Sequence, residues 1–146
     1  GGTELVFACG GAIYTSAAEA AVKTNGKVIG VDVDQAPTID GKYGEGLTVT
    51  SAMKGLSATV ETLLTAIHDG KWDEYSGKLM NLGLVSENPE ENYVQLPSST
   101  QFGDNFTEDD YKALVADIYN GKIKIDNAVD TDMSTVAHVV FEGNIK

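Results

Sequence analysis

The sequence has few cysteines and few basic residues, and it contains no long apolar run. Its one cysteine, Cys9, excludes a disulfide within the chain, and we expect it to be a small buried residue. Ten lysines and arginines stand against 22 aspartates and glutamates, which gives a formal net charge of −12. Nucleic acids and anionic lipid surfaces both require basic side chains, so this charge argues against either as a partner. We expect a solubilising acidic surface.

The length and the composition are those of one ordinary globular domain. The chain has 146 residues, 42% of them hydrophobic, and no apolar run is long enough to span a bilayer. No basic segment precedes the first apolar run, so we do not expect the amino terminus to be a signal peptide.

The first half alternates short apolar runs with helical patterns. Residues 5–9, 28–31 and 47–50 predict strands, and residues 12–23 predict a helix that ends at Asn25. The glycine-rich segment 36–46 predicts an irregular, exposed loop.

Ser51 is expected to cap a second helix that ends at Asp69-Gly70. Apolar residues recur in this helix at helical spacing and predict its core face: Met53, Leu56, Val60, Leu63, Leu64 and Ile67.

The second half is less regular. Residues 77–85 and 92–96 predict strands with a polar turn over 87–92 between them. Thr107 predicts the start of an acidic-headed helix that ends at Asn120. Residues 122–125 and 136–141 predict further short strands.

Two successive strand–helix–strand units predict an α/β fold with a parallel sheet flanked by helices. Parallel strands place their carboxyl ends at one edge, so Gly10, Gly11 and residues 32–35 and 50–54 should border one crevice. Asp32 is the leading ligand-binding candidate there, because a carboxylate accepts two hydrogen bonds from a vicinal diol such as that of ribose.

Four further candidate residues lie in these segments. Lys54 would stand in the first turn after Ser51, where positive charge is unfavourable, and such a violation can mark function. It would reach Asp32 or donate to a ligand, or simply be an exposed lysine. Asp34 ranks below Asp32 as a ligand-binding candidate, because it is also expected to cap or orient the loop. Gly10 and Gly11 could donate backbone N–H groups to an uncharged ligand.

Other chemistry is not indicated. The chain lacks the glycine fingerprint and the Walker lysine of nucleotide-binding loops, so we expect no cofactor. His68 and His138 show no metal spacing, and an acidic segment resembles a calcium loop only loosely, so we expect no metal site. No nucleophile–histidine set indicates an enzyme. Three aromatic residues could stack on a base, and none is assigned this role: Tyr14, Tyr43 and Trp72.

Four sequence blocks carry a resemblance to a known family. They are Phe-Ala-Cys-Gly-Gly at 7–11, Val-Ile-Gly-Val-Asp-Val-Asp-Gln at 28–35, Leu-Thr-Val-Thr-Ser-Ala-Met-Lys at 47–54 and Gly-Lys-Ile-Lys-Ile at 121–125. Together they resemble the basic membrane protein (BMP) family of extracytoplasmic lipoproteins, which are similar to purine nucleoside receptors and serve ABC importers. The blocks match the carboxyl-terminal portion of that family.

The resemblance implies a type I periplasmic-binding-protein-like lobe within an incomplete clamshell. Residues 1–85 would form the second-lobe core, and 86–146 the crossing segment and the elements that complete the first lobe. The implied ligand site comprises Asp32, Lys54, Gly10, Gly11 and Asp34. A full-length member would be a membrane-anchored lipoprotein with an ABC permease as partner, and its anchor lies in the portion this chain does not match.

The sequence departs from the family pattern directly after Gly11, where Ala12, Ile13 and Tyr14 stand in place of the family's Thr-Gly. Two alternatives to the solute-binding protein also stay open. One is an α/β enzyme domain that binds a nucleotide cofactor. The other is a truncated remnant without independent activity, in which a homodimer covers the surface of the absent lobe.

Overall fold

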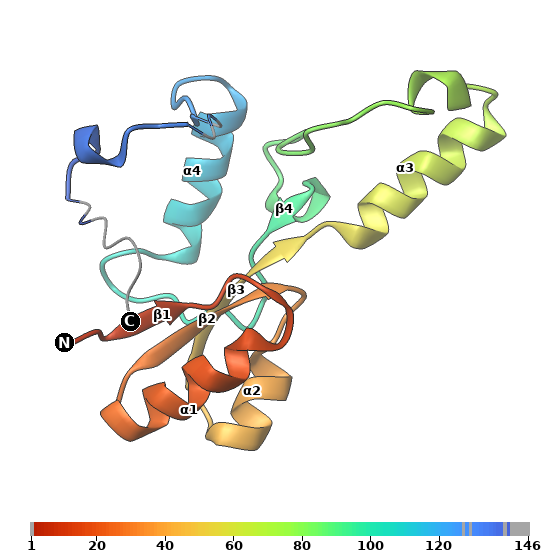
Figure 1. Cartoon of the computed structure of the whole chain (residues 1–146). Helices are drawn as coiled ribbons and strands as arrows, with labels where there is room; N and C mark the ends of the chain where they lie inside the picture. Colours follow the sequence, from red (N-terminus) through yellow and green to blue (C-terminus); the bar gives the residue numbers. More distant parts are fainter. Residues whose placement is uncertain (1, 127, 129, 139, 141–146) are drawn as a thin grey trace.

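A four-stranded sheet organises the molecule, as seen in a computed structural model that describes residues 2–126, 128, 130–138 and 140. Its strands follow one another in spatial order: β1 (Leu5–Phe7), β2 (Lys27–Asp32), β3 (Thr48–Lys54) and β4 (Val94–Gln95) (Figure 1). The first three are parallel, and β4 pairs antiparallel with β3. The predicted α/β class with a parallel sheet is therefore confirmed.

Helices α1 (Tyr14–Thr24) and α2 (Ala36–Tyr43) pack together on one face of this sheet (Figure 1). Helix α1 ends as predicted at Asn25, which adopts the left-handed conformation with a φ of 56°. The buried cluster between the helices and the sheet is small and aliphatic: Ala18, Ala21, Val28, Ile39 and Leu47.

The prediction of an irregular loop over 36–46 is wrong, because most of that segment is helix α2. Pro37 lies in the first turn, where proline is tolerated, and Ile39 is fully buried. The carboxylate of Asp40 accepts hydrogen bonds from the N–H groups of Gly46 and Thr48, both at 2.9 Å. Tertiary burial and this carboxylate outweigh the local turn signals of the glycines.

The third strand is longer than predicted and runs to Lys54, so Ser51 and Met53 belong to β3 and not to the following helix. Ser51 is fully buried within the sheet and caps nothing. Helix α3 (Leu56–His68) starts after Gly55 and leads away from the sheet (Figure 1).

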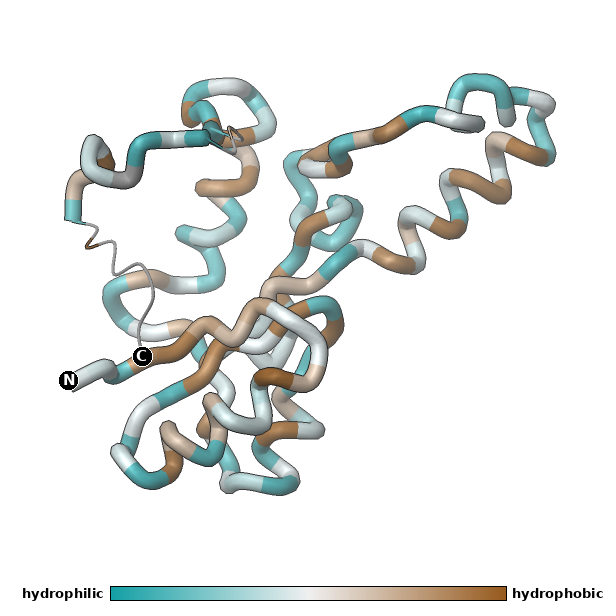
Figure 2. Tube along the Cα trace, in the orientation of Figure 1, coloured by the Kyte–Doolittle hydropathy of each residue, from teal (hydrophilic) through white to brown (hydrophobic). Residues whose placement is uncertain are grey.

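The predicted core stripe of α3 is largely exposed. Val60 and Leu64 keep 55% and 61% of their surface, and Leu56 and Ile67 are exposed to a similar degree. Figure 2 shows the apolar positions recurring along this projecting helix. From Leu56 to Ile67 the apolar residues do follow helical spacing, but the described part of the chain supplies no core for this face.

The chain then returns to the sheet along an extended path. Residues 77–85, all within the described part of the chain, form no strand, contrary to prediction. A 3₁₀ turn over Pro89–Glu91 matches the predicted polar turn, and β4 falls inside the predicted strand 92–96. Beyond β4 the chain continues along β3, since the N–H of Gln101 donates to the carbonyl of Val49 at 2.8 Å.

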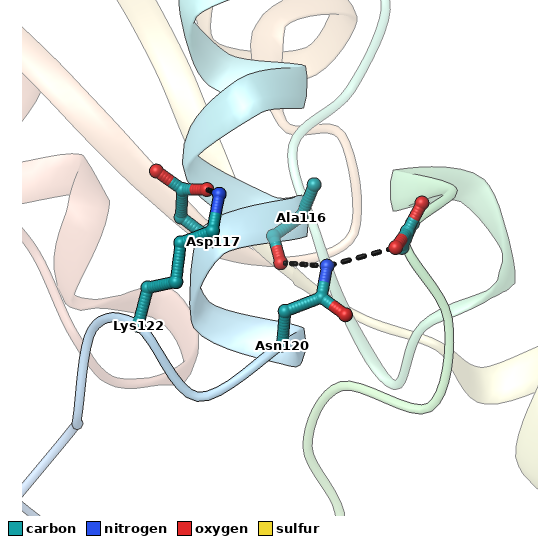
Figure 3. Close-up of polar contacts among 5 residues, drawn as sticks. Ala116, Asp117, Asn120 and Lys122 are labelled. Carbon is teal, nitrogen blue, oxygen red and sulfur yellow. Dashed lines mark hydrogen bonds and ion pairs between the residues drawn. The ribbon is translucent and has the colours of Figure 1, made fainter.

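Helix α4 (Glu108–Tyr119) begins at Thr107 with a capping box, as the sequence predicts. At its other end the Asn120 side chain donates to the Ala116 carbonyl at 2.9 Å and to the Glu87 carboxylate at 2.8 Å (Figure 3). Lys122 pairs with Asp117 at 2.6 Å in the same view. The end of α4 is thus tied to the returning segment.

The remaining predictions for the carboxyl-terminal region fail where they can be compared. The described residues 122–125 form no strand. Of 136–141, residues 136–138 are bends and turns, and 139 and 141 lie outside the described residues. Three short 3₁₀ turns complete the element list: Gly11–Ile13, Trp72–Glu74 and Met133–Thr135.

The structure also bears on the expected burial of Cys9 and on the search for membrane-spanning helices. Cys9 is exposed after the end of β1, so the expectation of a buried cysteine is wrong. It lies two residues beyond Phe7, the last residue of β1, which is an edge strand of the sheet. No helix in the described part of the chain is long and apolar enough to cross a membrane.

Gly30 of β2 provides a test of the packing between strands. A Cβ there would lie 2.6 Å from the Ser51 hydroxyl and 2.8 Å from the Gln35 amide oxygen. We expect Gly30→Ala to lower the free energy of unfolding by about 1–3 kcal/mol in urea denaturation, because the neighbours must shift. Gly41→Ala in α2 is the matched control.

In that control the added methyl group meets no atom within 4 Å outside the helix's own backbone. We expect the free energy of unfolding to rise by about 0.5–1 kcal/mol, because alanine is favoured over glycine within a helix. Equal midpoints for the two variants would contradict the packing.

Candidate functional site

The site is an exposed ion pair at the carboxyl ends of two neighbouring parallel strands. Asp32 is the last residue of β2 and Lys54 the last of β3. Lys54 Nζ lies 2.7 Å from Asp32 Oδ1, and the two side chains keep 68% and 45% of their surface. The hydrogen bond to Asp32 and its negative charge raise the pKa of Lys54 above the usual 10.5. Both groups therefore stay accessible to a ligand.

The backbone of Asp32 is strained. Its φ is 71°, in the left-handed region that non-glycine residues rarely adopt and that aspartate tolerates better than most. Such strain costs on the order of 1–3 kcal/mol and clusters at functional sites. The conformation turns the carboxylate out of the strand and toward Lys54.

The residues around Asp32 hold this conformation. The Gln35 amide oxygen accepts from the N–H of Val31 at 2.9 Å, and the N–H of Gln35 donates to Ser51 Oγ at 3.1 Å. The Gln35 amide oxygen and the Ser51 hydroxyl occupy the space that a side chain at Gly30 would fill. Residues 30–35 thus form one packed turn, and the Asp32 carboxylate lies at its edge, exposed and next to Lys54.

Asp32 and Lys54 line a groove of about 930 Å³ that runs between α3, the end of β3 and the segment leading into β4. Six carboxylates and two lysines line it: Asp32, Asp34, Glu61, Asp69, Glu90 and Glu91, with Lys54 and Lys71. The acidic surplus makes the groove unfavourable for phosphate and other anions and suits neutral ligands with many hydroxyls.

Asp34 borders the groove but its carboxylate is already engaged. Oδ1 accepts from the N–H of Ala36 at 3.1 Å and from the Ser99 hydroxyl at 2.8 Å. The first bond starts α2 and the second fastens the segment after β4. Asp34 therefore has the orienting geometry expected from the sequence.

The structure does not bring the two glycines into the groove. Gly10 and Gly11 follow β1 at the same sheet edge, yet neither is among the described residues that line the groove. Gly11 has a φ of 35° and opens a 3₁₀ turn. Their role as backbone donors stays a prediction.

The three aromatic residues considered for stacking on a base are likewise not among the described residues that line the groove. Tyr14 and Tyr43 pack against the aliphatic core. Trp72 lines a smaller apolar cavity of about 230 Å³ next to the groove, together with Tyr75. Tyr75 also borders the main groove, and the sequence reasoning did not consider it.

Several groove residues escaped prediction because they lie on the polar face of α3. Glu61, Thr62 and Thr65 line the groove, and their spacing puts them opposite the apolar stripe. The signal was present in the sequence as the complement of the stripe. This signal could not be used from the sequence alone, because the sequence does not show which face of the helix is exposed to solvent.

The structure indicates no metal centre within its described residues, where no group of three or more histidine, cysteine, aspartate or glutamate side chains could hold an ion. His68 pairs with the neighbouring Asp69 at 2.9 Å instead.

The raised pKa of Lys54 leads to a test of the ion pair. The pair contributes fully below the unfolded-state pKa of the lysine and is lost as the pH rises through the higher folded-state value. We expect Asp32→Asn to bring the pKa of Lys54 back toward 10.5, because the neutral amide removes the negative charge and accepts a weaker hydrogen bond. The measurement is a ¹³C NMR titration of the lysine Cε signals.

Lys112 is the internal control, since its pKa is raised by Glu108 on α4 and should not change. A Lys54 titration that is the same in both proteins would contradict the pairing.

Comparison of the chain with protein-family models and with curated proteins finds no match to either.

Proposed function

We propose that this chain is part of an extracytoplasmic solute-binding lipoprotein of an ABC importer, and that its groove binds a purine nucleoside or a related ribosyl compound. The proposal names a type I periplasmic-binding-protein-like lobe and a non-catalytic role. The observation that carries it is the exposed Asp32–Lys54 pair, held in a strained conformation at the carboxyl ends of parallel strands.

The chemistry of the pair suits a sugar diol. A carboxylate can accept two hydrogen bonds from adjacent hydroxyls, and an ammonium donates without accepting. Lys54 uses one Asp32 oxygen, so a ligand would share or displace that bond and find both groups already oriented. The BMP-like block Val-Ile-Gly-Val-Asp-Val-Asp-Gln contains this aspartate.

The charge of the groove supports a nucleoside over a nucleotide. Its acidic surplus would repel a phosphate, and this also weighs against the alternative of an enzyme domain with a nucleotide cofactor. That alternative would require a dinucleotide to bind more tightly than its nucleoside.

The exposed face of α3 supports a two-lobed protein. Soluble monomers rarely leave contiguous apolar patches larger than roughly 300–600 Å² uncovered. The stripe of α3 is continuous from Leu56 to Ile67, and the returning segment exposes Leu79 and Met80. In the proposed protein another lobe covers these side chains and closes over the ligand by a hinge motion, and the closed form engages a permease.

Calorimetry with a nucleoside panel tests the proposal. We expect adenosine or guanosine to give weak heat, 2′-deoxynucleosides less, and AMP less again. Asp32→Asn should weaken the ribonucleoside by about 10–100-fold, since it removes a charged hydrogen-bonding group worth about 1.5–3 kcal/mol. Asp104→Asn makes the same chemical change at an exposed position outside the groove and should have no effect.

Heat from a dinucleotide alone would favour the enzyme, and heat from no ligand would favour a remnant without activity. Either result would contradict the proposal for this groove.

The alternative of a homodimer predicts that a second copy covers the stripe of α3. Light scattering at tens of micromolar should then give twice the monomer mass, and Leu64→Glu should restore the monomer because it places a charge in the apolar contact. Glu61→Gln, on the opposite face of the same helix, should leave the dimer intact. A monomer in the unmodified protein contradicts the homodimer and leaves nucleoside binding untouched.

A further inference from the structure

Asn92 is an inaccessible polar residue in the segment that returns to the sheet. It has no exposed surface, and its side chain makes four hydrogen bonds. Oδ1 accepts from the N–H groups of Val85 at 2.6 Å and Ser86 at 2.9 Å, and Nδ2 donates to the carbonyls of Ser86 at 3.1 Å and Asn88 at 3.0 Å. A buried amide with these bonds made is costly to remove, so it fixes the loop 85–92 firmly.

The main chain of this loop lies directly against the junction of β3 and α3. A Cβ at Gly55 would lie 2.6 Å from the Asn92 carbonyl oxygen and 2.9 Å from Tyr93 Cα. The N–H of Gly55 donates to the Tyr93 carbonyl at 2.7 Å. The two backbones touch, and only glycine allows this approach.

Lys54 is the residue before this contact. It pairs with Val94 in the antiparallel ladder, and Met53 pairs with Gln95. The Gln95 amide donates in turn to the Asn92 carbonyl at 2.8 Å. The backbone of Lys54 is therefore held by β4 at Val94, between the last residue that β3 pairs with β2, Met53, and the contact of Gly55 with the Asn92 loop.

We propose that Asn92 is a positioning residue whose buried amide, acting through the backbone contact at Gly55, sets where Lys54 reaches across the groove to Asp32. The lysine side chain is long and mostly exposed, so only a fixed backbone limits the positions of its ammonium group. The use of Lys54 to bind a ligand rests on the proposed function, whereas the link from Asn92 to the ion pair does not.

NMR titration of Lys54 in Asn92→Ala and Gly55→Ala tests this link. We expect the Lys54 pKa to shift down toward 10.5 in both, because each change displaces the same backbone contact from opposite sides. Val115→Ala removes a buried side chain in α4 and is the control. It should lower the thermal midpoint without moving the Lys54 titration.

An unchanged Lys54 pKa in folded Gly55→Ala overturns the proposal even if Asn92→Ala fails to fold. An equal shift in Val115→Ala overturns it as well, because general destabilisation would then explain the effect. The measurement uses no ligand. A shifted Lys54 titration without nucleoside binding would therefore support the positioning role and contradict the proposed function. Nucleoside binding with an unshifted Lys54 titration would support the proposed function and contradict the positioning role.

Discussion

The arrangement of the groove depends on two glycines to which other groups approach closely, Gly30 within β2 and Gly55 after β3. Gly30 leaves room for the Gln35 amide and the Ser51 hydroxyl, which bond the turn that follows β2. Gly55 lets the returning segment lie against the end of β3. With both strand ends fixed in this way, Asp32 can hold its strained conformation and Lys54 can meet it at 2.7 Å. A side chain at Gly55 would require backbone movement next to the ion pair, and one at Gly30 would displace the side chains of Gln35 and Ser51.

Helix α3 combines two opposite roles. Its polar face contributes Glu61, Thr62 and Thr65 to the groove, and its other face exposes a stripe of large apolar side chains. An amphipathic helix is normally stabilised by burying its apolar face. Here the helix is held at its first turn by the Gly55 junction and elsewhere by a returning segment that buries only part of it. The groove and the exposed stripe thus share one element, so a partner bound to the stripe would also influence the groove.

The sequence predicted the positions of β1, β2, α1 and α4 well, because each has a local pattern and a clear stop signal such as Asn25 or the capping box at Thr107. It also predicted that Asp32 and Lys54 would lie at one sheet edge. It did so partly for the wrong reason, since Lys54 ends a strand and does not begin a helix. Helix α2 was missed because Pro37, Gly41 and Gly44 suggested a loop. Burial of Ile39 and the bonds of Asp40 decide that segment, and both depend on contacts outside it.

The sequence by itself determined the parallel order of the first strands and the acidic charge, because apolar periodicity and composition are local properties of the chain. It also placed a carboxylate at the end of a buried strand. Only the tertiary structure decided that Lys54 pairs with this carboxylate, that Asp34 is occupied by Ser99, and that Asn92 supports the junction at Gly55. Those contacts join residues from different strands and loops, and their geometry depends on how closely the backbones approach. Spacing along the chain does not contain that information.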